Sequence, residues 1–124
     1  MSWAKSMRRL SKTTGIDAKT VATTNLFTVP SGHTVVIVFA VATTEVANTV
    51  TQRPVMGIGI AAGEEDIFSS RALTGFTASD SVYMFSNSAK LVQAEASDVI
   101  KLGIDNGSTA TTHTITIELY GYYL

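Results

Sequence analysis

Two histidines and one acidic cluster are the residues best suited to metal chemistry. His33 and His113 each stand at the start of an expected strand, and the cluster spans residues 64–66. Two imidazoles and carboxylates can bind zinc or iron, but these histidines are not closely spaced along one strand. The cluster lacks the alternating acidic spacing of a calcium loop, and a solvated loop that discourages edge pairing is the simpler interpretation. We expect no metal and no cofactor.

The sequence also offers little support for covalent or acid–base catalysis. Serine and threonine are abundant, so a chance match to a Ser-His-acid set carries no weight, and no G-x-S-x-G turn occurs. The carboxylates stand mostly in expected turns rather than as a pair in a cleft. Gly57-Ile58-Gly59 is not a phosphate loop, because neither a lysine nor a helix follows it. We therefore expect that the protein is not an enzyme.

Charge is distributed unevenly along the chain, although the net charge is only −1. Residues 1–23 contain five basic residues and one acidic residue, whereas residues 24–124 contain four basic and nine acidic residues. This asymmetry predicts a basic arm that meets an acidic partner.

The first residues have a helical apolar spacing. Trp3, Met7 and Leu10 recur at i, i+4 and i+7, which predicts a short amphipathic helix over residues 2–12. Such a helix is too short to be stable alone, and the threonine-rich residues 13–24 are expected to be a linker. Among functional roles we favour anchoring to an acidic protein surface over non-specific nucleic-acid contact; the alternative is a flexible solubilising tail. The expected anchoring residues are Trp3, Lys5, Met7, Arg8, Arg9, Leu10 and Lys12.

Length and composition limit the number of domains and the forces that can hold the fold together. A chain of 124 residues, 45% hydrophobic and 15% charged, has the size and apolar content of one folded domain. It contains no cysteine, so the core or partner subunits must hold it together. The longest apolar run, Val35–Val41, is far shorter than the ~20 residues of a membrane span, and no secretory leader is recognisable.

The body has the pattern of an all-β domain. Alternating or continuous apolar runs are separated by turn signals such as Pro30-Ser31-Gly32 and Asp105-Asn106-Gly107-Ser108. Eight short strands with this spacing predict a sandwich, and eight is the jelly-roll count. We expect an arm and linker over 1–23 and a jelly-roll domain over 24–124. The expected strands span 26–29, 33–43, 54–60, 67–73 (a weak strand or short helix), 81–85, 90–94, 98–104 and 113–120.

Three tyrosines near the C-terminus admit two interpretations. Tyr120, Tyr122 and Tyr123 could form an aromatic patch that binds sugars. Alternatively, they complete the core or pack at a subunit interface, where tyrosine is common. We favour the second interpretation and take all three as candidate interface residues.

The body resembles a known group of proteins. The residues that carry the resemblance are Val29-Pro30-Ser31-Gly32, the apolar strand 33–43, the glycine-alternating strand 54–60, Leu73-Thr74-Gly75 and the ending 115–124, Ile-Thr-Ile-Glu-Leu-Tyr-Gly-Tyr-Tyr-Leu. Residues 25–124 are thereby similar to the small jelly-roll virion proteins of tailed bacteriophages. In that group such domains are trimeric capsid-decoration (cement) knobs or fibre tips.

The resemblance implies a structural role. The expected function is a homotrimeric cement knob that binds the major capsid protein on the outer surface of the phage head, after synthesis in the host cytoplasm. The alternative is a trimeric fibre or spike tip that binds a host cell-surface glycan. Neither role requires a membrane or a specific nucleic acid, and no individual functional residue carries over from the group.

Overall fold

The computed structural model describes residues 6–60, 66–86 and 91–124, and these residues form nine β-strands and no helix. Within them there is accordingly no helix that could span a membrane. The strands are β1 (Arg8–Asp17), β2 (Ala22–Thr28), β3 (Val35–Asn48), β4 (Val55–Gly59), β5 (Phe68–Ala72), β6 (Val82–Ser86), β7 (Val92–Ala94), β8 (Val99–Asn106) and β9 (Thr112–Tyr123).

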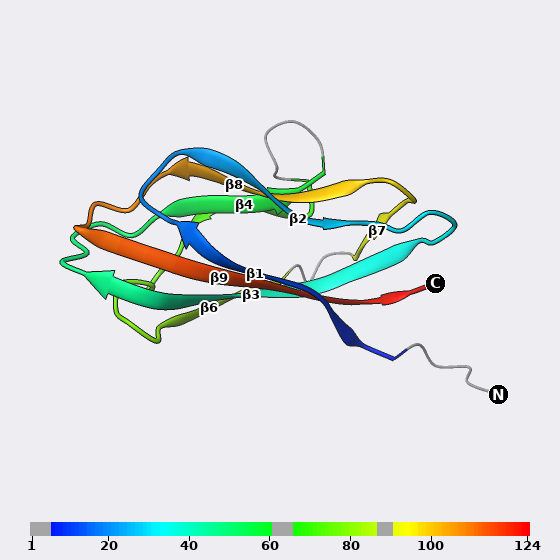
Figure 1. Ribbon diagram of the computed structural model, residues 1–124, viewed down its shortest axis with the longest axis horizontal. Coiled ribbons are helices and arrows are strands. Elements are labelled where there is room, and N and C mark those ends of the chain that lie inside the picture. The colour runs from blue at the N-terminus through cyan, green and yellow to red at the C-terminus, as the bar shows by residue number, and fades with distance from the viewer. Residues whose placement is uncertain (1–5, 61–65, 87–90) are drawn as a thin grey trace.

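The strands form two antiparallel sheets that face each other (Figure 1). Sheet A has the order β1-β9-β3-β6, with β7 also pairing with β3, and sheet B has the order β2-β8-β4-β5. Each sheet therefore pairs early strands with late ones, so the sandwich closes only when the C-terminal strands are in place. The expected all-β sandwich is confirmed, and the weak segment at 67–73 forms the strand β5 rather than a helix.

The core lies between the sheets and follows from the alternation along each strand. In β9, Ile115, Ile117 and Leu119 are fully buried, and in β4 Met56 and Ile58 are fully buried. These side chains belong to one apolar cluster that draws on both sheets. Because side chains alternate across a strand, the intervening residues of β9 point to the outer face of sheet A.

The N-terminal segment differs from its expected structure. Residues 8–12 are not helical: they begin β1, whose ten residues pair with β9. The expected linker over 13–24 contains the end of β1 and the start of β2, with Ile16 and Ala18 buried in the core. Residue 23 is therefore not a boundary between an arm and the domain, because sheet A already begins at Arg8.

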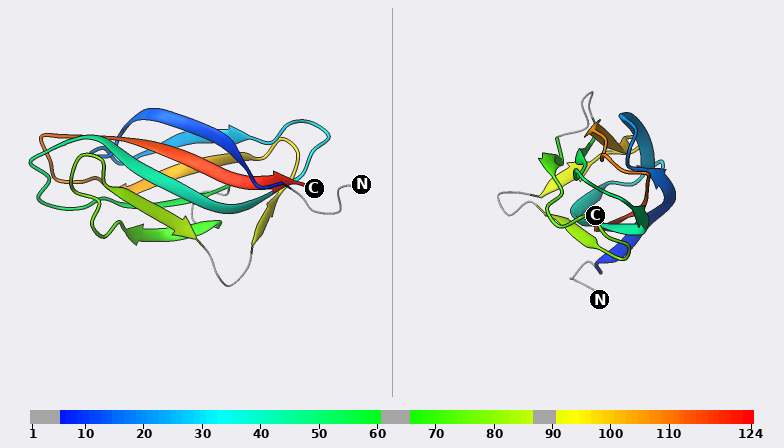
Figure 2. Two further views of the ribbon diagram at one scale, coloured as in Figure 1. Left: turned by 90° about the horizontal axis from the view of Figure 1, so that it is seen from below. Right: turned by 90° about the vertical axis from the view of Figure 1, so that its left-hand side faces the viewer.

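The sandwich is elongated, and its two ends carry different groups (Figures 1 and 2). The start of β1 and the C-terminus lie at one end, the terminal end, where Arg8 pairs with Gly121 and the amide of Leu124 donates to the carbonyl of Thr34 at 2.9 Å. The start of β9 and the end of β3 lie at the other, distal end, where Asn48 pairs with Thr112. The 12-residue strand β9 joins the two ends and spans roughly 40 Å at about 3.3 Å per residue.

Candidate functional site

The terminal end gathers basic and aromatic side chains. The guanidinium carbon of Arg8 lies 5.4 Å from the centre of the Tyr123 ring, a cation–π contact. The imidazole of His33 meets the same ring edge-on, with 5.2 Å between the ring centres. Together with Pro30 these residues line a cavity of about 340 Å³. The pair of cation and aromatic ring forms a surface suited to an acidic and partly apolar partner.

The basic side chains of β1 extend this surface along one edge of sheet A. Arg9 Nη1 lies 3.0 Å from Glu118 Oε2 of β9, and Lys12 stands opposite the same glutamate in the register. Arg8 and Lys12 are exposed. Because an exposed ion pair of this kind stabilises a fold by only about 0–1 kcal/mol, the Arg9–Glu118 pair contributes little to the free energy of folding.

The expected anchoring residues are thus only partly arranged as predicted. Arg8, Arg9 and Lys12 share the strand β1, and Met7 just before it is exposed. Leu10 is half-buried and packs against the core rather than facing solvent. Trp3 and Lys5 lie outside the described residues.

The three tyrosines are divided between the outer face and the core. Tyr123 packs against the core, whereas Tyr120 stacks on Phe39 of β3 with 4.7 Å between ring centres and 8° between planes. Tyr122 is half-buried and stands opposite Val36. Next to the Phe39–Tyr120 stack, Val41 pairs with Met84 and Thr43 with Val82. We name the apolar residues of this region the sheet A patch: Phe39, Val41, Val82, Met84 and Tyr120.

His113 lies inside the sandwich near the distal end and does not meet His33. Its Nδ1 lies 2.8 Å from Ser108 Oγ and its Nε2 lies 3.1 Å from Thr44 Oγ1. Ser81 Oγ donates to Thr44 Oγ1 at 3.1 Å and extends this network to the turn before β6. Burial lowers the pKa of His113, and the charge of Asp17 opposes this shift.

Asp17 is held ionised by its own neighbours. The backbone N–H of Lys19 donates to Asp17 Oδ1 at 3.0 Å and lowers the pKa of this carboxyl, and the hydroxyl of Thr20 assists at 2.8 Å. No hydrogen bond joins Asp17 to His113 among the described residues. The Ser108–His113 pair therefore lacks the orienting carboxylate of a catalytic triad. Ser108 and His113 are also buried, so a substrate could reach the hydroxyl only if the sandwich opened.

The described residues considered for metal binding do not come together in the structure either. Within the described parts of the chain, no three His, Cys, Asp or Glu side chains come together to hold an ion. Asp66 instead accepts a hydrogen bond from the amide of Ile60 at 2.6 Å. Glu64 and Glu65 lie outside the described residues.

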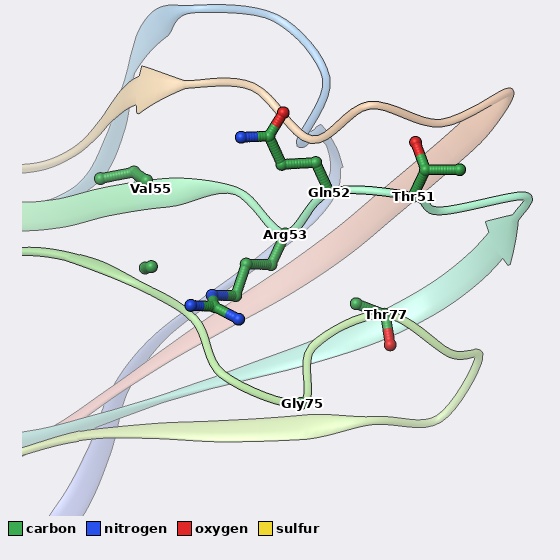
Figure 3. A pocket seen from close by; sticks show the side chains of 7 residues that line it. Thr51, Gln52, Arg53, Val55, Gly75 and Thr77 are labelled. Atoms are coloured by element: carbon green, nitrogen blue, oxygen red, sulfur yellow. The ribbon is translucent and has the colours of Figure 1, made fainter.

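A second cavity, of about 420 Å³, lies at the distal end. Figure 3 shows the side chain of Arg53 extending between Val55 and the turn that carries Gly75 and Thr77. No sequence pattern marks this pocket, because its walls come from the loop and strand start at β3–β4 and from the end of β5 with the loop that follows it. The residues that line it are Thr51, Gln52, Arg53, Val55, Ala72, Gly75 and Thr77.

Comparisons with known proteins place the fold. No family model and no curated protein matches the sequence. Among solved structures, the chain is similar to a chain of the capsid asymmetric unit of cyanophage Pam1, with 12% identity and a TM-score of 0.59 over 98% of this chain and 88% of that one. It is also similar to a chain of the acidic stable capsid of Helicobacter pylori bacteriophage KHP30, with 12% identity and a TM-score of 0.60 over 98% and 97% of the two chains. At this identity the likeness establishes a shared fold over almost the whole chain.

Proposed function

We propose that this protein is a structural component of a bacteriophage virion: a homotrimeric cement knob that binds the major capsid protein on the outer surface of the head. The observation that carries the proposal is the shared fold, since both matched chains come from phage capsid structures and nearly their whole lengths superpose. The interleaved order of the two sheets further supports the jelly-roll winding that the resemblance implies.

The surface of the terminal end supports attachment there. Arg8 and Lys12 are exposed cations on β1, and Tyr123 and Pro30 supply apolar area beside Arg8. An acidic patch on the capsid protein would be attracted by the charges and held by the aromatic contact. The proposed attachment surface consists of the β1 edge of sheet A together with residues 1–7.

Copy number tests the proposal most directly. Quantitative mass spectrometry of purified particles should give one copy of this chain for each capsid subunit, or a constant fraction near that ratio. A few to a few dozen copies per particle would instead place the protein at a vertex or in the tail, as expected for a fibre or spike tip. Absence from particles would refute both roles.

Attachment through the terminal end is tested with variants of the isolated protein. A chain lacking residues 1–7, and the double variant Arg8→Glu/Lys12→Glu, should keep the folded trimer but bind decoration-free capsids at least tenfold more weakly. Arg53→Glu makes a matched charge reversal at the distal end and should leave capsid binding unchanged. Equal loss with Arg53→Glu would show that attachment does not occur through the terminal end.

A further inference from the structure

The distal pocket contains a cation with no partner among the described residues. Arg53 makes no hydrogen bond and no ion pair with any described residue, whereas Arg9 pairs with Glu118 and Arg71 bonds to the carbonyl of Ser69. No acidic side chain lines the pocket. Arg53 is exposed, and because a guanidinium offers five donors and carries a positive charge, an anion is the ligand that complements it best.

The walls around Arg53 are held by the backbone. The amide of Leu73 donates to the carbonyl of Pro54 at 3.0 Å, which ties the turn after β5 to the start of β4. On the other side, the amide of Thr51 donates to the carbonyl of Thr109 at 2.7 Å, and the amide of Thr109 donates to the carbonyl of Gln52 at 3.0 Å. The pocket is therefore formed before any ligand enters, which lowers the entropic cost of binding.

The remaining lining groups are polar or small and carry no charge. The side-chain oxygen of Gln52 accepts a hydrogen bond from Thr109 Oγ1 at 3.3 Å, and the Gln52 side chain extends away from that of Arg53 (Figure 3). The hydroxyl of Thr77 has no partner among the described residues. Val55 and Ala72 add a small apolar wall. The volume of about 420 Å³ falls within the range of small-molecule sites, roughly 300–1,000 Å³.

We propose that the Arg53 pocket binds an acidic sugar, a uronic or sialic acid unit of a surface glycan. Arg53 would bind the carboxylate through two parallel N–H donors, Thr77 would bind a ring hydroxyl, and Val55 with Ala72 would contact the C–H face. A docking peptide would instead need a large apolar or aromatic anchor site, which this lining lacks. In a subunit attached by the terminal end the pocket faces away from the shell; this orientation alone depends on the proposed function.

The test uses the isolated protein and free sugars, so its result is independent of capsid binding. Galacturonate, glucuronate and N-acetylneuraminate are titrated into ¹⁵N-labelled protein, with galactose and glucose as neutral controls. At least one acidic sugar should shift the amide signals of Gly75 and Thr77 saturably, with a dissociation constant in the millimolar range typical of weak ligands. The neutral sugars should bind at least tenfold more weakly, because they lack the charged hydrogen bond.

Variants distinguish binding in the Arg53 pocket from non-specific electrostatic attraction of acidic sugars to the protein. Arg53→Gln should weaken the acidic sugar at least tenfold, and Arg53→Lys should weaken it too, since lysine cannot form the bidentate pair. Lys12→Gln removes a cation at the basic edge and should change nothing. Equal binding of neutral sugars, absence of shifts at high millimolar concentration, or equally tight binding of acetate or a glutamate-rich peptide would each overturn the proposal.

Discussion

His113 Nδ1 lies 2.8 Å from Ser108 Oγ inside the sandwich, and both residues are buried. On the other side of the ring, Nε2 meets the hydroxyl of Thr44 of β3. A hydroxyl can donate or accept, so the neutral imidazole is satisfied in either tautomer. The network thereby joins β3, β9 and the turn between β8 and β9 through a polar group in an otherwise apolar core.

The buried imidazole makes stability depend on pH. Burial lowers the pKa of His113 in the folded state, so the unfolded chain binds more protons between the folded and unfolded pKa values. The contribution of His113 is thus fully present above the unfolded pKa of about 6.5 and is lost as the pH falls toward the folded value. The urea midpoint should be lower near pH 5 than near pH 7.5 by this contribution.

The variant His113→Gln should flatten this dependence. Asp17 titrates in a lower range, because its pKa is lowered from 3.8, and does not contribute to the slope between pH 5 and 7.5. Asp17→Asn removes the charge that opposes the shift of His113 and should therefore steepen the decline. An unchanged slope in His113→Gln would assign the pH dependence to another group.

Removal of the buried hydroxyl of Ser108 should lower the free energy of unfolding more than removal of an exposed hydroxyl. Ser108→Ala leaves His113 Nδ1 buried without its partner, and an unpaired buried group costs about 1–3 kcal/mol. Thr111→Ala, an exposed substitution in the same segment, should change the free energy of unfolding by no more than about 0.5 kcal/mol. Urea unfolding at neutral pH measures both. Equal effects would mean that the hydrogen bond contributes no more than the general loss of a surface side chain.

Gly121 is required where β9 lies between β1 and β3. A Cβ at this position would overlap the carbonyl oxygen of Val36 and lie 3.2 Å from Leu10 Cδ1. We expect Gly121→Ala to destabilise the fold by about 1–3 kcal/mol through overpacking. The comparison is Gly32→Ala, where a Cβ meets open space and only the positive φ of 78° is strained, at a cost of about 1–2 kcal/mol. Hydrogen exchange separates them, since only Gly121→Ala should loosen the amides of β1.

The strands of the body could be predicted because their alternation is regular and turns mark their ends. In β9, for example, Ile115, Ile117 and Leu119 alternate with polar residues and are all buried. The strand β1 could not be predicted, because register shifts between Arg9 and Ser11 and between Thr13 and Ile16 break its period of two. The spacing of Met7 and Leu10 resembled a helix by coincidence.

The candidate binding surfaces were less predictable than the strands. The charge asymmetry singles out the basic N-terminal residues, but it could not show that Arg8 contacts Tyr123 at the other end of the chain. The Arg53 pocket depends on Gly75 and Thr77, more than twenty positions away. Such juxtapositions arise from the topology of the sandwich and leave no local pattern in the sequence.

The sheet A patch provides the last prediction. Val82 and Met84 on the edge strand β6 are each 58% exposed, and the outer face beside them carries Val41 and the Phe39–Tyr120 stack. If the proposed trimer forms, this contiguous apolar region is the best described candidate for its interface. Met84→Glu would bury a charge there and should shift the protein to monomers in light scattering coupled to size-exclusion chromatography. Thr28→Glu, an exposed substitution on β2 of sheet B, should leave the trimer intact, whereas a trimer that tolerates Met84→Glu would exclude the patch as its interface.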